Sequence, residues 1–518
     1  MIQKTELAPG MLKEVPDRQR REILAGMRWT LWLSVICAPL GYITTILLAR
    51  VDPAVVGTYG LLSLYISLTS IFLFFGGNGV AIKFLPELPA EQRLSFLSSY
   101  FLVILAATLP YQIGASVWPR GLQYVLGSEA GNWFGVLLVW LAPFYIFSSL
   151  MLAALKGLLE IKWSQVYNRI ITLASFALYA VLYFAARPFL ASHYVAIIWS
   201  TYLVLATLVT VLAMRRFLRH FRGSHLRESV RFFLPPGFWA YTSGLQLVSI
   251  LSFLSTRLDY LFILNAGGLV EFGRYVTLIT LVSVIPTFAT FVLDSLLPSL
   301  TNTLALRNYV SSRHLVEIYL RFMLPCGMLA GTFAILFARP LFAVLGPRYL
   351  DLVSLGLVAF PIAALQVLNW FVGTMFTAIG QPYGDVIAKA GRMVVFCVAF
   401  WLLWSPYRLW GAIAAWGIAE VGYQGLGLLV LLRRMPFRFS FVSTYVAFLS
   451  GVGLAAAFAG YLGNRHLLIS AVVWLALVGG FFVAARYSLR EIRELAHLVL
   501  PASISAAILS PTPGSPRL

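Results

Sequence analysis

The stretch Ala49-Arg-Val-Asp-Pro-Ala-Val-Val-Gly-Thr-Tyr59 joins two long apolar runs and combines a proline turn with a Gly-x-Tyr start of the second run. A second stretch, Asn265-Ala-Gly-Gly-Leu-Val-Glu-Phe-Gly-Arg-Tyr275, aligns with it without a gap, and Gly57 then falls on Gly273. Glycine and tyrosine are common in this chain, so Gly-x-Tyr alone can match by chance. Because both copies stand at a predicted helix–turn–helix junction, we interpret the chain as two related halves, each opened by such a hinge.

The composition is typical of a membrane protein. Of the 518 residues, 60% are hydrophobic and only 11% are charged, and the mean hydropathy is +0.86. Soluble proteins carry roughly a quarter charged residues. Apolar runs of about 20 residues, long enough to cross a hydrocarbon core as helices, recur along the chain. A membrane β-barrel would instead show alternating segments of about ten residues. We therefore predict an all-α polytopic membrane protein.

About fourteen apolar runs are long enough to be transmembrane helices, and the short loops between them suit antiparallel neighbours. If the N-terminus is cytoplasmic, 29 of the 38 Lys and Arg residues fall on the inner side and nine on the outer side. This bias follows the positive-inside rule and predicts that both termini are cytoplasmic. It also accounts for the net charge of +19, which therefore does not indicate nucleic-acid binding. The predicted spans are 29–49, 57–81, 95–117, 133–155, 164–186, 192–213, 236–264, 273–299, 317–338, 352–378, 384–404, 408–431, 440–462 and 467–486.

The hinges lie six spans apart, so the halves are predicted to be parallel repeats. We expect two pseudo-symmetric lobes around a central cavity, where transporters with internal repeats place their substrate. The basic run from Arg215 to Arg231 falls where a linker is expected, and it favours an amphipathic interfacial helix over a ligand site. The predicted parts are a cytoplasmic N-terminal segment (1–28), an N-terminal lobe (29–213, spans 1–6), a basic cytoplasmic linker (214–235), a C-terminal lobe (236–431, spans 7–12), two additional spans (440–486) and a partly disordered cytoplasmic tail (487–518).

The sequence contains no pattern typical of an enzyme. It has no Walker loop, no His-Glu-x-x-His zinc signature and no Gly-x-Ser-x-Gly elbow. Cys37, Cys326 and Cys397 lie alone in separate apolar runs, and none of the six histidines falls in the middle of a span. Isolated cysteines do not make a metal site. We therefore predict a transporter with no cofactor and no metal site, driven by an ion gradient or by substrate flux.

Three acidic residues fall well inside predicted spans, where a charge costs roughly 3 kcal/mol or more and usually faces a cavity. Glu420 lies nearest a bilayer centre, in the run Trp410-Gly-Ala-Ile-Ala-Ala-Trp-Gly-Ile-Ala-Glu420, whose small residues permit close helix packing. It is a candidate for binding a coupling proton or sodium, or a protonated residue hydrogen-bonded to a neighbouring helix. Asp294, near the cytoplasmic end of its span, is a second coupling candidate or an interfacial residue. Asp259 is the third.

Three basic residues are candidates for binding an anionic substrate. Arg257 lies near the outer end of the seventh span, two residues before Asp259. Residues two apart on a helix do not share a face, so Arg257 is expected to meet an anionic substrate and Asp259 a basic residue on another helix. Lys83 ends the second span and Arg28 begins the first, where both would line an inward-facing mouth and attract phosphate. Interfacial anchoring explains all three basic residues about as well.

The first hinge is predicted to act in gating. The charge distribution places Arg50 and Asp52 at the outer face. The repeat makes this hinge one of two equivalent hinges that face each other across the lobes. We therefore expect Arg50 and Asp52 to help close the outward gate rather than to bind the substrate.

Six short motifs, taken in their order and span positions, resemble those of the polysaccharide (O-antigen/exopolysaccharide) flippases in the multidrug/oligosaccharidyl-lipid/polysaccharide exporter superfamily. The resemblance covers the chain from about residue 23 to 486. The motifs are Ile46-Leu-Leu-Ala-Arg50 with the following Asp52-Pro and Gly57-x-Tyr59, Gly79-Val-Ala-Ile-Lys-Phe84, Arg257-Leu-Asp-Tyr260, Phe272-Gly-Arg-Tyr275, Leu297-Pro-Ser-Leu300 and Ala378-Ile-Gly-Gln381.

The resemblance implies twelve to fourteen helices in two lobes and the turnover of an undecaprenyl-pyrophosphate-linked oligosaccharide by alternating access in a bacterial inner membrane. It also implies basic cavity residues, a role that we carry over to Arg257, Lys83 and Arg28. A polysaccharide polymerase and chain-length machinery are possible partners. One alternative is a cation-coupled multidrug exporter of the same superfamily, with Glu420 as the coupling site. Another is a membrane glycosyltransferase or ligase, which would need a large extracytoplasmic loop that the predicted spans do not leave.

Overall fold

The computed structural model describes 37, 39–118, 133–158, 160–219, 232–287, 300, 304, 309–379, 382–435, 442–462 and 467–485. Two of the predicted site residues, Arg28 and Asp294, lie outside these residues. So do the predicted N-terminal segment (1–28), the tail (487–518) and most of the predicted basic linker.

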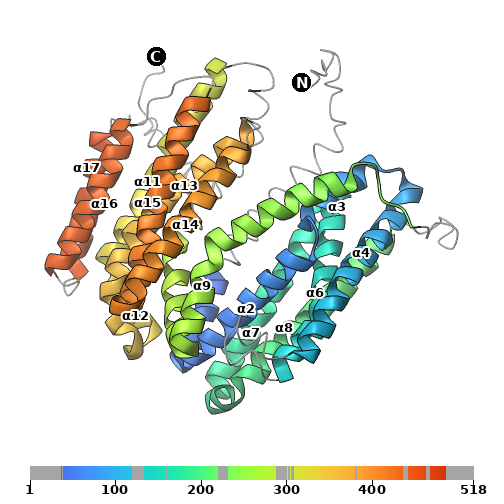
Figure 1. The fold of residues 1–518 in the computed structure, drawn as a ribbon. Helices are drawn as coiled ribbons and strands as arrows, with labels where there is room; N and C mark the ends of the chain where they lie inside the picture. Colours follow the sequence, from blue (N-terminus) through green and yellow to red (C-terminus); the bar gives the residue numbers. More distant parts are fainter. Residues whose placement is uncertain are drawn as a thin grey trace, which may run out of the picture. The chain divides into compact units, whose positions relative to one another are not determined.

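All regular structure in the described part of the chain is helical (Figure 1). Eleven of these helices are long and apolar enough to cross a membrane, and three shorter apolar helices cover residues 39–51, 142–157 and 238–254. The prediction of an all-α polytopic membrane protein is confirmed. The count of about fourteen spans stays a prediction.

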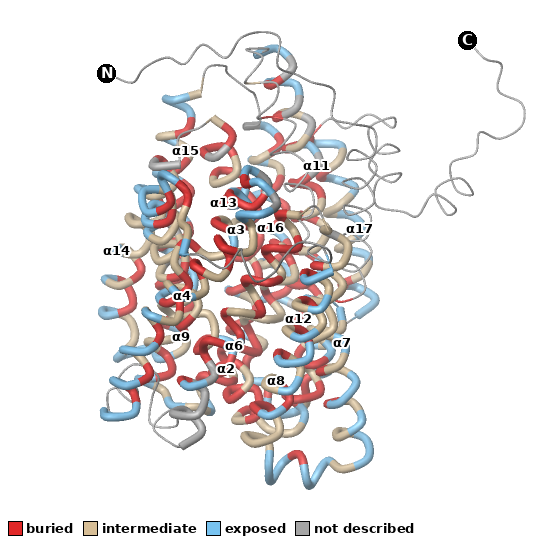
Figure 2. The backbone as a smooth tube through the Cα atoms, turned by 90° about the vertical axis from the view of Figure 1, so that its right-hand side faces the viewer, coloured by how far each residue is buried: buried red, intermediate tan, exposed pale blue. Residues whose placement is uncertain are grey.

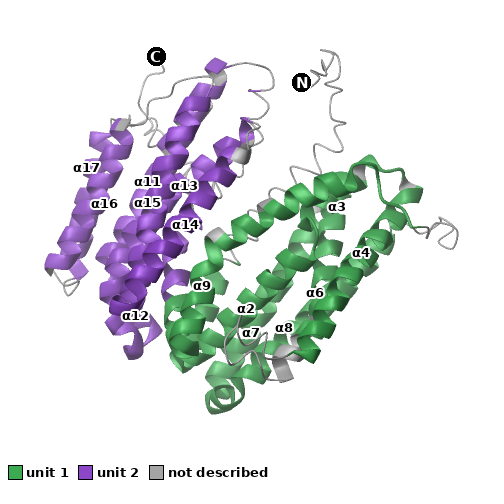
Figure 3. Ribbon diagram, viewed as in Figure 1, with its two compact units in different colours: residues 1–277 green, residues 278–518 purple. Residues whose placement is uncertain are grey.

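The chain divides into two compact units, residues 1–277 and residues 278–518 (Figure 3). The border falls inside a helix, later in the chain than the predicted linker (214–235), and the predicted lobe boundaries stay a prediction. Unit 1 holds α2 (Pro53–Leu73), α3 (Gly77–Glu87), α4 (Ala90–Val117), α6 (Trp133–Gly157), α7 (Ile161–Ala185), α8 (Arg187–Leu218) and most of α9 (Phe238–Val282). Unit 2 holds α11 (Tyr309–Leu336), α12 (Ala338–Leu345), the short helix η3 (Pro347–Leu352), α13 (Val353–Ala378), α14 (Pro382–Tyr407), α15 (Leu409–Arg434), α16 (Val442–Leu462) and α17 (Leu467–Ala484).

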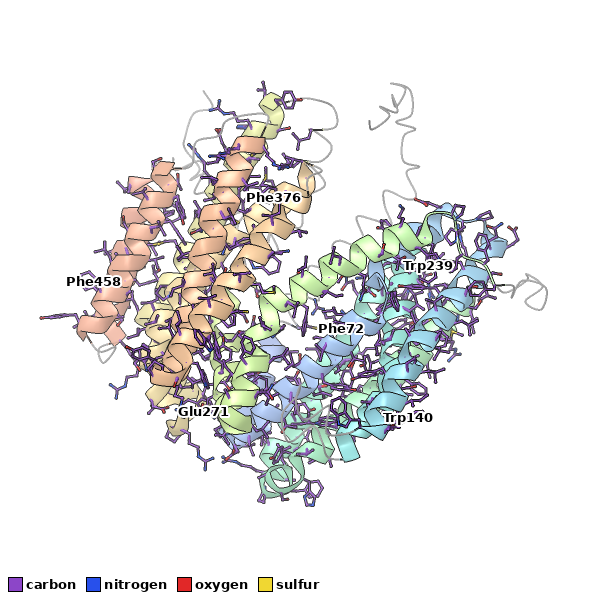
Figure 4. All side chains as sticks on the ribbon, viewed as in Figure 1. Phe72, Trp140, Trp239, Glu271, Phe376 and Phe458 are labelled. Atoms are coloured by element: carbon purple, nitrogen blue, oxygen red, sulfur yellow. The ribbon has the colours of Figure 1, made fainter. Side chains whose placement is uncertain are left out.

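Large apolar side chains are exposed along many helices, and exposed residues are frequent on α14 and α17 (Figure 2). Four aromatic examples, Phe72, Trp140, Trp239 and Phe458, are between 41% and 57% exposed (Figure 4). Water would disfavour so much exposed apolar surface, whereas lipid tails accept it. The exposed apolar residues therefore support a membrane location of these helices.

The core of unit 1 is built around an aromatic cluster that fixes the start of α9. Phe238, the first residue of α9, is buried and packs edge-on against Tyr100 of α4, with ring centroids 5.5 Å apart. Phe84 of α3 lies 6.2 Å from the same Phe238 ring. The Tyr100 hydroxyl is satisfied by donating to backbone carbonyl oxygens of Phe75 and Gly77. Edge-on aromatic packing of this kind adds about 1 kcal/mol per pair to the area that it buries.

A chain reversal divides α9 into two antiparallel arms. Gly268 has φ 74° and ψ −179°, a conformation that side chains with a Cβ rarely adopt. The Tyr275 hydroxyl donates to Asp259 Oδ2 at 2.7 Å. Sixteen residues of continuous helix would separate the two residues by about 24 Å, so the second arm folds back along the first. This arrangement agrees with the predicted break between the spans 236–264 and 273–299.

The two glycines that the sequence alignment pairs meet at one helix crossing in unit 1. A Cβ atom at Gly273 would overlap the carbonyl oxygen of Pro53 and approach the backbone nitrogen of Gly57. A Cβ at Gly57 would in turn overlap the carbonyl oxygen of Leu269. Neither position has room for a side chain, which explains why both hinges carry glycine. Both glycines lie in unit 1, and their role as equivalent hinges of two related halves stays a prediction.

Candidate functional site

Arg257 and Asp259 lie on the first arm of α9, and their predicted partners, an anionic substrate for Arg257 and a basic residue on another helix for Asp259, stay predictions. The Arg257 guanidinium carbon lies 4.7 Å from the centre of the Tyr260 ring. Asp259 accepts the hydrogen bond from Tyr275 on the second arm. The tyrosine of the second hinge, Tyr275, thus holds the two arms of α9 together through Asp259.

Lys83 is exposed near the end of α3 and also lies over an aromatic ring. Its Nζ atom is 4.0 Å from the centre of the Tyr241 ring and 5.3 Å from that of Phe84. A cation held over a ring is attracted by the negative face of the ring, by about 0.5–1 kcal/mol at exposed sites. Lys83 and Arg257 therefore both make a cation–π contact with a tyrosine ring.

The hinge residues Arg50 and Asp52 have local structural roles. Asp52 is the N-cap of α2, and its Oδ1 accepts from the backbone N–H of Ala54 at 2.9 Å. Pro53 then occupies the first helical position, where its missing N–H costs nothing. The backbone carbonyl of Arg50 accepts a hydrogen bond from Arg187 of α8. These contacts fix the start of α2. Their part in gating stays a prediction.

Glu420 lies in the middle of α15, and its side chain is only 3% exposed. It accepts hydrogen bonds from four side chains, one charged and three neutral. The donors are Arg392 Nη2 at 2.5 Å, Gln366 Nε2 at 2.6 Å, Asn369 Nδ2 at 2.5 Å and Trp416 Nε1 at 3.0 Å. Four donors match the roughly four lone-pair positions of a carboxylate. The carboxylate is therefore satisfied by α13, α14 and α15 of its own unit.

The hydrogen bonds that Glu420 accepts from α13 and α14 agree with one part of the expectations for this residue. The expectations are a bound proton or sodium, or a protonated glutamate hydrogen-bonded to a neighbouring helix, and both the ion and the protonation stay predictions. In the structure the partner is an arginine, and the pair joins α14 to α15 in a part of the bundle where the Arg392 side chain is 12% exposed. The role of Glu420 in ion coupling stays a prediction.

A second ion pair lies one turn before Arg392 on α14. Lys389 Nζ is 2.8 Å from Asp385 Oδ2, and the Tyr423 hydroxyl of α15 donates to Asp385 Oδ1 at 2.6 Å. Both pairs thus combine a cation on α14 with a carboxylate that also receives neutral donors. We refer to Asp385, Lys389, Arg392 and Glu420 as the α14–α15 charge cluster.

The cationic half of this cluster, Lys389 and Arg392, is not among the predicted site residues. Both belong to the 29 Lys and Arg residues that the positive-inside pattern places on the inner side, a pattern that explains basic residues near helix ends. The signal that could have identified them was their depth, since both fall inside the predicted span 384–404, at a spacing that places them on the same helix face. Gln366 and Asn369, polar residues inside the predicted span 352–378, were a second signal.

Comparison by sequence matches no protein-family model and no curated protein. Comparison by structure gives extensive matches. A structure titled "Lipid II flippase MurJ, inward closed conformation" is 13% identical, covers 88% of this chain and 98% of its own chain, and has a TM-score of 0.67. An inward-facing multidrug resistance MATE transporter of the MOP superfamily is 15% identical, covers 79% of this chain and 97% of its own, and has a TM-score of 0.62.

A MOP superfamily transporter from Pyrococcus furiosus is 14% identical and covers 81% of this chain and 95% of its own, with a TM-score of 0.54. Its title attributes a different function to the reverse polarity of its binding pocket. The chain has the fold of MOP superfamily transporters. At these identities the likeness shows the fold alone, so the function has to be argued from the residues of this chain.

Proposed function

We propose that this chain is a flippase that moves an undecaprenyl-pyrophosphate-linked oligosaccharide across the bacterial inner membrane by alternating access, for cell-surface polysaccharide biosynthesis. The observation that carries the proposal is the structural match to a lipid II flippase over 88% of the chain. A lipid-linked substrate of that kind carries a pyrophosphate. The cations Arg257 and Lys83, each placed over a tyrosine ring, supply the complementary charge.

Arg257 is suited to bind a phosphate. A guanidinium carries five N–H donors, more than the single hydroxyl of the neighbouring Tyr260 can accept. Its planar fork matches two phosphate oxygens at once. The contact with the Tyr260 ring orients the group before the substrate arrives, which lowers the entropy lost on binding. Lys83 contributes a point charge on α3, and Arg28 has the same proposed role outside the described residues.

The test is polymer export by Arg257→Glu in a flippase-deficient strain complemented with this chain. Reversal of the charge is expected to abolish surface polymer while the protein still inserts in the membrane fraction. Arg339→Glu, at an exposed arginine of α12, is the matched control and should export normally. Normal export by Arg257→Glu would contradict the proposed substrate.

The competing function is a cation-coupled multidrug exporter, favoured by the several matched structures titled MATE transporters. It would assign cation exchange to a membrane carboxylate, for which Glu420 is the candidate. Glu420 instead meets an arginine and three neutral donors, which favours the flippase. Two results together would reverse this choice. A drug-sensitive strain that expresses the chain would become resistant to ethidium, and expression of the chain would fail to restore polymer export in the flippase-deficient strain.

The proposal places both termini in the cytoplasm and the first hinge, with Arg50 and Asp52, at the outward gate. Cysteine labelling from either side of the membrane, with a Cys-less chain as the starting point, tests the placement: a cysteine introduced beside Arg50 should react with an impermeant reagent from outside. Contact with a polysaccharide polymerase or chain-length machinery belongs to the same proposal and is testable by crosslinking in the native membrane.

A further inference from the structure

The α14–α15 charge cluster lies on the side of α14 that faces away from its exposed apolar side. Ile387, Val394 and Val398 are each more than half exposed. With 3.6 residues per turn, these three residues share one face of the helix, and Asp385, Lys389 and Arg392 lie on the opposite face. The apolar face suits lipid. The charged face is therefore turned toward the protein side of the helix.

Lys389 and Arg392 form a pair of neighbouring cations. Residues three apart on a helix have Cβ atoms about 5–6 Å apart. Each cation is the more exposed member of its ion pair: the Arg392 side chain is 12% exposed against 3% for Glu420, and that of Lys389 is 26% exposed against 15% for Asp385. An incoming anion would therefore meet the cations before the carboxylates.

The carboxylates keep other partners when the cations are removed. Glu420 would retain the three neutral donors Gln366, Asn369 and Trp416. Asp385 would retain the hydroxyl of Tyr423. A buried carboxylate stripped of every donor would be very costly, but a carboxylate held by neutral donors loses much less. Each carboxylate would thus keep at least one hydrogen-bond donor if its cation bound another anion.

We propose that Lys389 and Arg392 form a two-cation subsite for the diphosphate group of an isoprenoid carrier, with Asp385 and Glu420 as resident counter-ions that the diphosphate displaces. A guanidinium and an ammonium side by side match two linked phosphoryl groups, the first as a bidentate donor and the second as a point charge. This inference rests on the proposed function and names a binding site in unit 2 for the same class of substrate.

The alternative is that the contacts of the cluster only hold α14 and α15 together, which we call the lock. The two ideas give opposite results when a carboxylate is neutralised. If the carboxylates compete with the ligand, removing their charge strengthens binding of a diphosphate. If they hold the helices together, removing their charge weakens binding or leaves it unchanged.

The experiment measures binding of geranylgeranyl diphosphate to the full-length protein in nanodiscs, by isothermal titration. Glu420→Gln and Asp385→Asn are each expected to bind about tenfold more tightly, because the competing charged partner is gone. Arg392→Gln is expected to bind about ten- to a hundredfold more weakly, and Lys389→Gln about tenfold more weakly. A gain of affinity is a result that misfolding does not produce.

Arg313→Gln is the matched control. Arg313 pairs with Glu317 at 2.9 Å in the same unit, but its side chain is 54% exposed and lies on α11. This variant should bind the diphosphate as the wild type does. The double variant Arg392→Gln/Glu420→Gln, neutral on both sides, should keep its thermal stability and still bind weakly. A double variant that regains wild-type affinity would mean that Arg392 serves only to neutralise Glu420, which would overturn the inference.

The other outcomes separate the inference from the proposed function. If the wild type binds no geranylgeranyl diphosphate, both fail. If the wild type binds it, Arg257→Glu abolishes binding and the Arg392 and Lys389 variants are unchanged, the proposed function stands and the two-cation subsite is wrong. Weaker binding by Glu420→Gln and Asp385→Asn would establish the lock in place of the subsite.

Discussion

Two ion pairs of the same residue types differ in how far they are buried in this protein. In unit 1, Glu160 lies just before α7, and both of its oxygens accept from Arg216 in the last turn of α8, at 2.7 and 3.0 Å. Their side chains are 16% and 27% exposed. In unit 2, Glu420 and Arg392 pair within the lengths of α15 and α14, where the exposed fractions fall to 3% and 12%.

The two pairs differ in the free energy that is needed to bury their charges. Ion pairs that water can reach contribute about 0–1 kcal/mol, because water replaces a lost partner. Burying both partners costs several kcal/mol per ion before the attraction between them is counted, and apolar residues often pack as well or better. A pair at helix ends therefore costs little free energy, and orientation of the helices in the membrane is enough to explain it. A pair inside a membrane bundle, surrounded by three neutral donors, points to a function that requires charge.

The strongest test of this contrast is Glu420→Ala. It removes the acceptor of four donors and leaves Arg392 buried without its counter-ion, so unfolding in detergent should become easier by about 3–5 kcal/mol. Thermal unfolding followed by intrinsic fluorescence measures the loss. Glu160→Ala provides the control, and a comparable loss in that variant would remove the contrast between the two pairs.

Arg392→Gln should be milder than Glu420→Ala. The carboxylate keeps Gln366, Asn369 and Trp416 as donors, and we expect a loss of about 1–3 kcal/mol, typical of one charge-assisted hydrogen bond. The same unfolding measurement applies. A loss as large as that of Glu420→Ala would show that the neutral donors do not sustain the carboxylate.

Tyr423→Phe sharpens the comparison within unit 2. It deletes one neutral hydrogen bond to Asp385 and keeps the Lys389 pair. Hydrogen bonds between membrane helices are worth about 0.6 kcal/mol on average, so the expected loss is about 1 kcal/mol or less. A larger change would indicate that Asp385 depends on this hydroxyl more than on Lys389.

Glu160→Gln should have the smallest effect, about 0–1 kcal/mol. Its effect should also depend on salt, because this pair is partly exposed and charges that water reaches are screened with a Debye length of about 10 Å at 0.1 M and about 3 Å at 1 M. The difference between wild type and Glu160→Gln is expected to shrink between 0.1 and 1 M NaCl, whereas that for Glu420→Gln should not. Equal salt sensitivity in both variants would contradict the burial argument.

The sequence predicted the membrane-spanning helical architecture because apolar runs and the distribution of basic residues are local properties of the chain. It also predicted the reversal between residues 264 and 273, where Gly268 supplies the turn, and it paired Gly57 with Gly273. These features depend on neighbours within a few residues, or on a repeat that can be read by alignment.

Tertiary structure alone brought Arg392 to Glu420, 28 residues apart on two helices, and added Gln366 and Asn369 from a third. In the sequence, Arg392 has the same local pattern as an arginine that marks the cytoplasmic side, and Glu420 is a carboxylate in an apolar run. Whether such a group lies at the membrane interface or forms an ion pair inside the bundle depends on which helices pack together and at what register. Packing of that kind is set by side-chain fit across distant segments, which hydropathy and charge along the chain do not encode.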